Sequence, residues 1–191
     1  QDSILVVSTR NSEGLWAVYD MSTNGLIGSY IKIGRASGEV IFPPRVSGQA
    51  FYDRGKARYC TIYDFGSGKL LDMNITETIN HKTLRLAESS INLERSLFNV
   101  VRIDSTAFFC RRVDGGCTVQ ERFLISNGME SSNHSIDILN EYKVQSGDDI
   151  NILNATYCYN SERDILIEAP MYLNYLNAYS LKGDSTGTTL F

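Results

Sequence analysis

The chain has 191 residues and a formal net charge of −4, with 42% hydrophobic and 21% charged residues. This composition is typical of a globular domain of ordinary size and excludes a disordered chain. The acidic balance argues against general affinity for nucleic acid or anionic membranes, which bind basic faces. No apolar run approaches the length of a membrane span, so we expect no membrane-spanning segment.

Apolar and polar residues alternate with a period of two along most of the chain, which predicts strands. In chain order, we expect strands at residues 4–8, 15–20, 26–33, 49–52, 57–64, 69–75, 98–103, 107–112, 118–125, 164–168 and 172–181. Turns containing glycine separate many of them, and Asn24-Gly25 between two apolar runs is a strong hairpin signal. We therefore predict an all-β protein with one domain over residues 1–182 and a loose polar tail at 183–191.

Evidence for helices is thin, and we expect at most one or two short ones, at residues 89–95 and 135–142. Two hairpins share a Tyr-Asp pair, Tyr19-Asp20 and Tyr63-Asp64, and lie about 44 residues apart, near the period of propeller blades. The third expected hairpin lacks this pair. We therefore favour shared turn chemistry over a true repeat.

Four cysteines, Cys60, Cys110, Cys117 and Cys158, have spacings unlike those of zinc sites. Two disulfides are the better interpretation, with three possible connectivities. Cys110 and Cys117 flank an Asp-Gly-Gly turn that could bring their sulfurs together, and Cys60 with Cys158 would then follow by elimination.

Three glycosylation sequons begin at Asn74, Asn133 and Asn154. Three sequons together with an even number of cysteines favour a secreted glycoprotein. A chain that begins at Gln1 also fits cleavage of a signal peptide, so we expect an extracellular location.

Catalytic signatures are scarce in the sequence. Its only histidines are His81, in a polar stretch, and His134, inside a sequon, and neither fits a general base. No nucleophile elbow, metalloprotease motif or phosphate-binding loop is present. We therefore predict that the chain is not an enzyme.

Acidic residues are densest at Asp148 and Asp149, which could share a Ca²⁺ ion on one loop. The spacing is not that of an EF-hand, and a solvated loop is the favoured interpretation.

Aromatic residues are the positive signal, with 11 Tyr, 8 Phe and 1 Trp, many of them on expected strands. They are suited to a sandwich core and also to an apolar ligand pocket with a few phenol groups that fix the ligand. The candidates for such a pocket are Trp16, Tyr19, Tyr59, Tyr63, Phe108, Phe123 and Tyr172.

Two stretches resemble the ependymin-related family of secreted glycoproteins. The segment from Ser8 to Asp20 is similar to that family's first hairpin. The segment from Cys117 to Ile125 is similar to its Cys-x-Pro-Val strand, and a Gly-Asp-Asp-Ile stretch and Cys158 follow at similar spacing. The chain departs from the family in lacking the initial Cys-Pro segment and in the positions of Cys60 and Cys110.

The resemblance implies two curved antiparallel sheets that form a half-open barrel or sandwich around an apolar pocket, similar to bacterial lipoprotein carriers. It also implies a lipophilic ligand, either a carotenoid or a lipid, calcium binding, and a dimer with the same or a related chain. Our leading hypothesis is therefore a secreted carrier. The alternatives are a matrix or adhesion glycoprotein that binds Ca²⁺, and a β-propeller fragment that acts as an interaction platform.

Overall fold

A computed structural model of the chain describes residues 4–11, 13–44, 51–113, 120–130, 145, 147–181 and 186–190. The chain divides into two compact units, Gln1–Ser96 and Leu97–Phe191, and the single domain over residues 1–182 stays a prediction. Each unit has its own hydrophobic core, and this accounts for the division.

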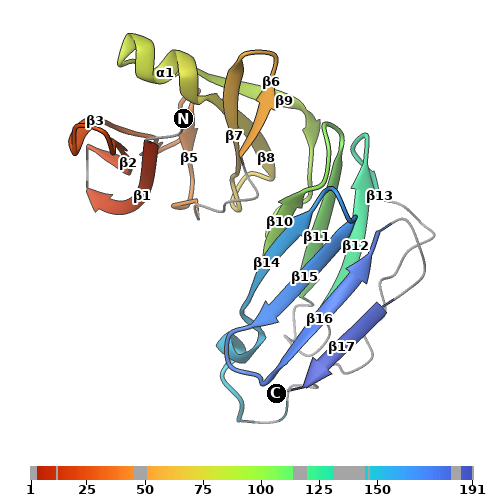
Figure 1. The fold of residues 1–191 in the computed structure, drawn as a ribbon. Helices are drawn as coiled ribbons and strands as arrows, with labels where there is room; N and C mark the ends of the chain where they lie inside the picture. Colours follow the sequence, from red (N-terminus) through yellow and green to blue (C-terminus); the bar gives the residue numbers. More distant parts are fainter. Residues whose placement is uncertain are drawn as a thin grey trace. The chain divides into compact units, whose positions relative to one another are not determined.

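The first unit contains two antiparallel sheets and a short parallel pair (Figure 1). The strands of the first sheet are β1 (Ile4–Asn11), β2 (Gly14–Asp20) and β3 (Gly25–Tyr30), in that order. The parallel pair is β4 (Lys32–Ile33) and β5 (Glu39–Val40). The next sheet has β6 (Phe51–Arg54), β7 (Ala57–Tyr63), β8 (Lys69–Asn74) and β9 (Leu86–Asn92), and helix α1 (Ile75–His81) lies between β8 and β9 in the chain.

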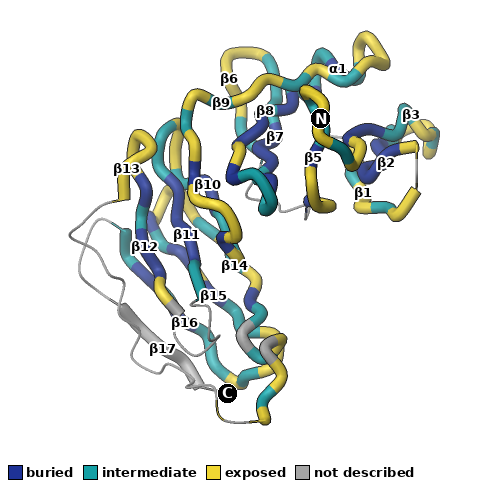
Figure 2. Tube along the Cα trace, turned by 180° about the vertical axis from the view of Figure 1, so that it is seen from behind, coloured by how far each residue is buried: buried dark blue, intermediate teal, exposed yellow. Residues whose placement is uncertain are grey.

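The core of the first unit joins its two larger sheets. Alternate residues of β2, including Trp16 and Val18, point to the same face and are buried against Ile62 of β7 and Met73 of β8. Figure 2 shows the buried residues concentrated on β2, β7 and β8. One face of each sheet packs on this core, so the two sheets form a sandwich around it.

The second unit contains two further four-stranded antiparallel sheets. The strands of one are β10 (Asn99–Arg102), β11 (Ala107–Val113), β12 (Gln120–Ser126) and β13 (Met129–Glu130). The strands of the other are β14 (Ala155–Asn160), β15 (Ile165–Pro170), β16 (Tyr175–Ser180) and β17 (Thr186–Leu190), and the 3₁₀-helix η2 (Ile150–Leu153) precedes it. Val101 and Phe109 of the former sheet share a core with Leu166 and Tyr179 of the latter.

The predicted all-β class is confirmed, with only α1 and η2 as helical elements of the described residues. The strands belong to five small sheets, and none of the five is closed into a barrel within the described ranges. Of the two expected helices, residues 89–95 lie partly in β9, and residues 135–142 lie outside the described part. The expected loose tail contains β17, which pairs with β16.

The strands of each larger sheet are neighbours in the sequence, so each sheet is a simple meander. The two hairpins with the Tyr-Asp pair, β2–β3 and β7–β8, occupy the same place in successive meanders. The interpretation of their similarity as shared turn chemistry stays a prediction. Four-stranded meanders of this kind are the building unit of β-propellers.

Candidate functional site

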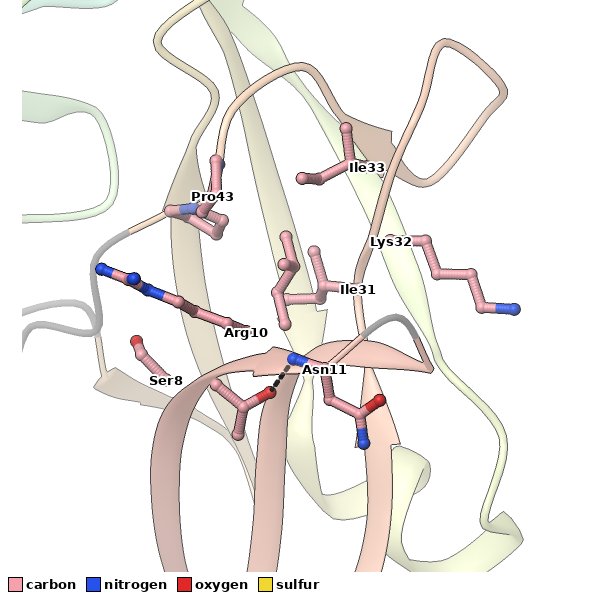
Figure 3. Close-up of a pocket in the computed structure, with 10 residues that line it drawn as sticks. Ser8, Arg10, Asn11, Ile31, Lys32, Ile33 and Pro43 are labelled. Carbon is pink, nitrogen blue, oxygen red and sulfur yellow. Dashed lines mark hydrogen bonds between the residues drawn. The ribbon is translucent and has the colours of Figure 1, made fainter.

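A groove of about 710 Å³ lies at the end of the first sheet, where the β1–β2 turn meets the chain that leaves β3 (Figure 3). Its described lining comes from three short segments of the first unit. These residues are Ser8, Thr9, Arg10, Asn11, Leu15, Ile31, Lys32, Ile33, Pro43 and Pro44. The lining thus combines two cations, hydroxyl and amide groups, and branched or cyclic apolar side chains.

The segment after β3 is bent sharply at Ile31. This residue has φ of 66°, in the left-handed region that a β-branched residue rarely adopts, and it is almost fully buried. Its carbonyl oxygen accepts a 2.8 Å hydrogen bond from the backbone N–H of Leu15. The bend and this bond hold Ile31 in the groove and place Lys32 and Ile33 on exposed backbone beside it.

The opposite wall, residues 41–44, is tethered at both ends by buried side chains. Asp64 accepts a 3.1 Å hydrogen bond from the backbone N–H of Ile41. The indole Nε1 of Trp16 donates to the carbonyl oxygen of Pro44 at 3.3 Å. Two consecutive prolines fix φ between these tethers, so the wall is restrained before any ligand arrives.

The β1–β2 turn forms the third side. The Thr9 hydroxyl donates to the Gly14 carbonyl at 2.7 Å and accepts from the backbone N–H of Asn11 at 3.3 Å (Figure 3). A Cβ on Gly14 would lie only 2.5 Å from the backbone nitrogen of Tyr30. Glycine is therefore required for the close approach of β2 to β3 at the base of the groove.

The charged groups of the groove lining are both cations. Arg10 extends toward Pro43, whereas Lys32 points away on the other side (Figure 3). Neither makes an ion pair with another residue of the described ranges. Glu39 is opposite Lys32 in the β4–β5 ladder, but its carboxylate accepts the Ala36 N–H at 2.9 Å. The groove is thus cationic within a chain of net charge −4.

The lining determines which groups the groove offers to a ligand. The groove's described residues include no His, Cys, Asp or Glu to exchange protons near neutral pH. The Thr9 hydroxyl is already committed to the Gly14 carbonyl. What remains for a ligand is a guanidinium, an ammonium, hydroxyl and amide groups, and an apolar surface.

A second cavity of about 460 Å³ lies on the other side of Lys32. Its described lining is Ser29, Tyr30, Ile31, Lys32, Ser37, Gly38, Glu39, Lys82, Leu84 and Leu86. Burial raises the pKa of Tyr30, whose hydroxyl has no hydrogen-bond partner among the described residues. The hydroxyl lies against Gly28 of the same sheet, where an added Cβ would approach it to 2.6 Å.

The aromatic residues that we predicted as a pocket belong to both units. Four belong to the first unit and three to the second, and none is in the described lining of either cavity. Trp16, Phe108 and Phe123 are core residues, each at most 3% exposed. Tyr172 lies between β15 and β16 and is 64% exposed.

The other three predicted aromatics are half-buried tyrosines of the first unit. Tyr59 stacks on Tyr52 with ring centroids 5.5 Å apart. The Tyr63 hydroxyl donates to the carbonyl oxygen of Glu94 at 2.7 Å, and Tyr19 lies near the end of β2. Tyr59 and Tyr63 thus contact neighbouring segments of the first unit, and the single aromatic pocket stays a prediction.

The asparagines of the three sequons differ in their structural positions. Asn74 caps α1 by accepting the Glu77 N–H at 2.9 Å, and its amide donates to the Tyr59 hydroxyl at 3.1 Å. Asn154 is half-buried after η2, and Asn133 lies outside the described residues. Glycosylation of the three remains a prediction.

Cys60 is a fully buried free thiol whose Sγ donates to the Thr61 carbonyl at 3.7 Å. Cys158 is exposed on β14 in the other unit, and Cys110 is buried on β11. Cys117 lies outside the described part. Because Cys60 and Cys158 belong to different units, their predicted pairing stays untested.

The acidic pair Asp148 and Asp149 binds backbone groups. Asp148 accepts the Gln145 N–H at 2.7 Å, and Asp149 caps η2 by accepting the Asn151 N–H at 2.8 Å. Within the described ranges, no three His, Cys, Asp or Glu side chains are grouped so that they could hold a metal ion. Calcium binding at this loop stays a prediction.

Sequence reasoning missed Arg10, Lys32 and the Pro43-Pro44 wall. The usable signals were a cation that ends an apolar strand and a Pro-Pro pair outside any expected strand. Neither signal places the residues together, since the tethers from Asp64 and Trp16 connect segments far apart in the chain.

Comparisons with known proteins leave the family open. No family model matches the chain, and no curated protein matches it. A solved structure of the dihydro-heme d1 dehydrogenase NirN in complex with DHE is similar, with 12% identity and a TM-score of 0.47. The match covers 98% of this chain and 37% of that one, and it is too weak to assign a fold or a function. The resemblance to ependymin-related proteins stays a hypothesis from the sequence.

None of the described helices is both long and apolar enough to cross a bilayer.

Proposed function

We propose that this chain is a non-enzymatic binding module of blade-like β-meanders, and that its groove binds a short acidic segment of a partner protein. The observation that carries the proposal is that two cations, Arg10 and Lys32, flank a groove with restrained walls on opposite sides at the end of the first sheet. It develops the interaction-platform alternative of the sequence analysis.

The chemistry of the lining sets the ligand class. A guanidinium binds a carboxylate through two parallel hydrogen bonds, and an ammonium adds a second point of attraction. Between the cations, Leu15, Ile31 and Pro44 supply an apolar surface for a branched side chain. An acidic segment with an apolar residue between its carboxylates fits this order of groups.

The size and rigidity of the groove support the same ligand class. A volume of about 710 Å³ holds a few residues of peptide. The wall at residues 41–44 is already tethered, so little ordering entropy is lost on binding.

The lipophilic carrier of the sequence analysis rests on the family resemblance alone. Its predicted pocket residues are divided between the two units, and three of the seven, Trp16, Phe108 and Phe123, are buried. Secretion, glycosylation and a bound carotenoid or lipid therefore stay predictions from the sequence, and organic extraction of protein from its natural source tests the last of them.

The groove hypothesis is tested with a fluorescein-labelled hexapeptide of alternating glutamate and leucine, with the lysine–leucine peptide as the probe control. We expect saturable fluorescence anisotropy with the acidic peptide, weakened by added salt. Arg10→Glu and Lys32→Glu should each weaken binding by about tenfold or more, because reversal of a contacting charge costs on the order of 1–3 kcal/mol.

The matched control is Lys56→Glu, which reverses an exposed lysine in the β6–β7 turn of the same unit. It should leave the affinity unchanged. Equal loss in all three variants would show attraction by overall charge instead of a groove, and absence of binding to the acidic peptide would refute the proposal.

A further inference from the structure

Strand β1 is an open edge of the first sheet. Its register to β2 runs from Ile4 opposite Asp20 to Asn11 opposite Gly14, and no other strand of the described residues pairs with it. In an antiparallel edge strand, every second residue directs its N–H and C=O groups away from the sheet. Over residues 4–8, β1 therefore presents backbone donors and acceptors with which another strand can pair.

The apolar side chains of β1 are exposed on both faces of the sheet. Ile4 and Val6 are on the face of the core, because Val6 lies opposite the buried Val18, and Leu5 and Val7 are on the other face. Ile4, Leu5 and Val7 are 37%, 44% and 38% exposed. Figure 2 shows the contrast with β2, whose residues are mostly buried. A strand added beside β1 would cover apolar side chains on both faces.

β1 lacks the features that usually protect an edge strand from pairing, which are short length, charged side chains and proline. It has eight residues, begins with four consecutive apolar ones and carries no charge before Arg10. Among the described residues of this unit, the larger sheets have three other outer strands. β6 has only four residues, two of them charged, β9 carries Glu88, and β3 has two glycines among six residues. β1 is thus the edge best suited to strand addition.

The groove lies in line with this edge. Residues 8–11 of β1 line the groove, and residues 4–7 of the same strand lead away from it. Arg10 extends toward Pro43, so one cation of the groove lies near the end of the strand (Figure 3). An extended segment with a carboxylate bound to Arg10 would therefore have its next residues beside residues 4–7.

We propose that the acidic segment of the partner protein continues past the groove as a β-strand that pairs antiparallel with residues 4–8 of β1. The inference rests on the proposed function and adds the mode of recognition, in which main-chain hydrogen bonds give affinity and alternate side chains give specificity. Antiparallel pairing is the more stable arrangement per residue, and β1 already pairs in this way with β2.

Antiparallel pairing also sets the order of groups in the partner. The first residues of the segment lie opposite Arg10, and the later ones lie opposite Ile4. The partner therefore carries its carboxylates first and β-branched residues such as valine and threonine after them. Such residues favour strands and form good cross-strand pairs with the apolar side chains of β1.

Fluorescence anisotropy with the full chain compares two labelled peptides. One is the glutamate–leucine hexapeptide, and the other extends it at its C-terminus by five residues that alternate valine and threonine. The extension should strengthen binding by about tenfold or more, because several new cross-strand pairs add to the groove contacts. The same five residues at the N-terminus should give no gain, since an antiparallel segment would then run beyond Asn11, where β1 ends.

Two N-methylated versions of the C-terminal extension test for main-chain pairing. A strand directs alternate N–H groups to opposite edges, so methylation of one alternate set blocks pairing with β1 and methylation of the other set does not. We expect one version to lose the gain and the other to retain it. A contact made by side chains alone would not distinguish the two versions in this way.

Leu5→Asp and Leu26→Asp locate the added strand on the protein. Register places both side chains in one row on the same face, at opposite edges of the first sheet, and both are exposed. Each variant adds the same charge, so general repulsion of an acidic peptide is matched. Only Leu5→Asp should remove much of the gain from the extension, while both variants bind the hexapeptide alike and circular dichroism shows that each is folded.

The outcomes separate this inference from the groove hypothesis. Failure of the hexapeptide to bind would refute the proposed function and the strand addition with it. Three other results would overturn the strand addition and leave the groove hypothesis standing. They are binding of the hexapeptide without a gain from the C-terminal extension, equal affinities of the two methylated versions, or a loss of the gain in Leu26→Asp instead of Leu5→Asp.

Discussion

Arg122 of β12 and Glu168 of β15 form a bidentate ion pair that joins the two sheets of the second unit. The arginine Nε and Nη2 donate to the two carboxylate oxygens at 2.7 and 2.8 Å, and both side chains are only 2% exposed. The hydroxyls of Tyr157 and Tyr179 donate to the same carboxylate at 3.0 and 2.9 Å. Its charge and hydrogen-bonding capacity are therefore met inside the protein.

Glu168→Gln should destabilise the protein strongly. The change leaves the buried Arg122 guanidinium without its counter-charge, which typically costs about 3–5 kcal/mol. Urea unfolding at neutral pH measures the loss. The double variant Arg122→Met, Glu168→Leu should lose much less, since no buried charge is left; if it loses more than Glu168→Gln, the ion pair is not the source of the effect.

We expect acid to remove the stabilisation that the ionised Glu168 carboxylate gives to the fold. Burial by itself raises the pKa of Glu168, but the hydrogen bond and charge of Arg122, with the two tyrosine hydroxyls, outweigh it and hold the pKa below its ordinary value of 4.5. A carboxyl with a lowered folded-state pKa stabilises the fold above its unfolded pKa, and the stabilisation is lost as the pH falls through the folded value.

Thermal unfolding of wild type and Glu168→Gln over about pH 3 to 7, a range that brackets the ordinary glutamate pKa of 4.5, checks this dependence. The difference in melting temperature should be constant near neutral pH and shrink in acid. A difference that grows on acidification would mean that the pKa of Glu168 is raised.

Gly14→Ala should be destabilising although it is a minimal change. The added Cβ would lie 2.5 Å from the nitrogen of Tyr30 and 2.6 Å from the carbonyl carbon of Ser29, which are backbone atoms that cannot move aside cheaply. We expect a loss of about 1–3 kcal/mol, as for other overpacked sites. Gly25→Ala is the matched control, because its Cβ would meet only the Thr23 side chain, at 3.1 Å; equal effects of the two would contradict the close-approach argument.

Cys60 should resist alkylation in the native protein. Burial, followed by the nearby Asp72 charge, raises the pKa of its thiol to about 12, so almost no thiolate exists at pH 8. Iodoacetamide followed by peptide mass spectrometry should label the exposed Cys158 first and Cys60 only after unfolding. Rapid native labelling of Cys60 would contradict its burial, and a peptide linking Cys60 to Cys158 would establish the predicted disulfide instead.

Local patterns predicted the strands well because alternation and turn residues are properties of neighbouring positions. The expected strand at 15–20 is β2, and the expected strand at 107–112 is β11, within a residue or two at each end. Helix α1 was missed because its seven residues were divided between an expected strand end and a polar stretch, although Asn74 and Glu77 carry its capping signal.

Distant contacts explain what the sequence did not show. Alternation cannot orient a strand, so Trp16 was assigned to a ligand pocket when it is a core residue that anchors Pro44. The groove depends on Asp64 reaching Ile41 and on the left-handed turn at Ile31, neither of which follows from local propensity. The division of the predicted pocket aromatics between two units likewise becomes visible only in three dimensions.

The most direct test of the central claim is to map where the acidic peptide binds. Titration of the glutamate–leucine hexapeptide into ¹⁵N-labelled protein should shift the amide signals of Arg10, Asn11, Lys32 and Ile33, which line the groove. Signals of the second unit, such as that of Phe109, should not move. Shifts confined to the second unit, or spread over the whole surface, would contradict the account.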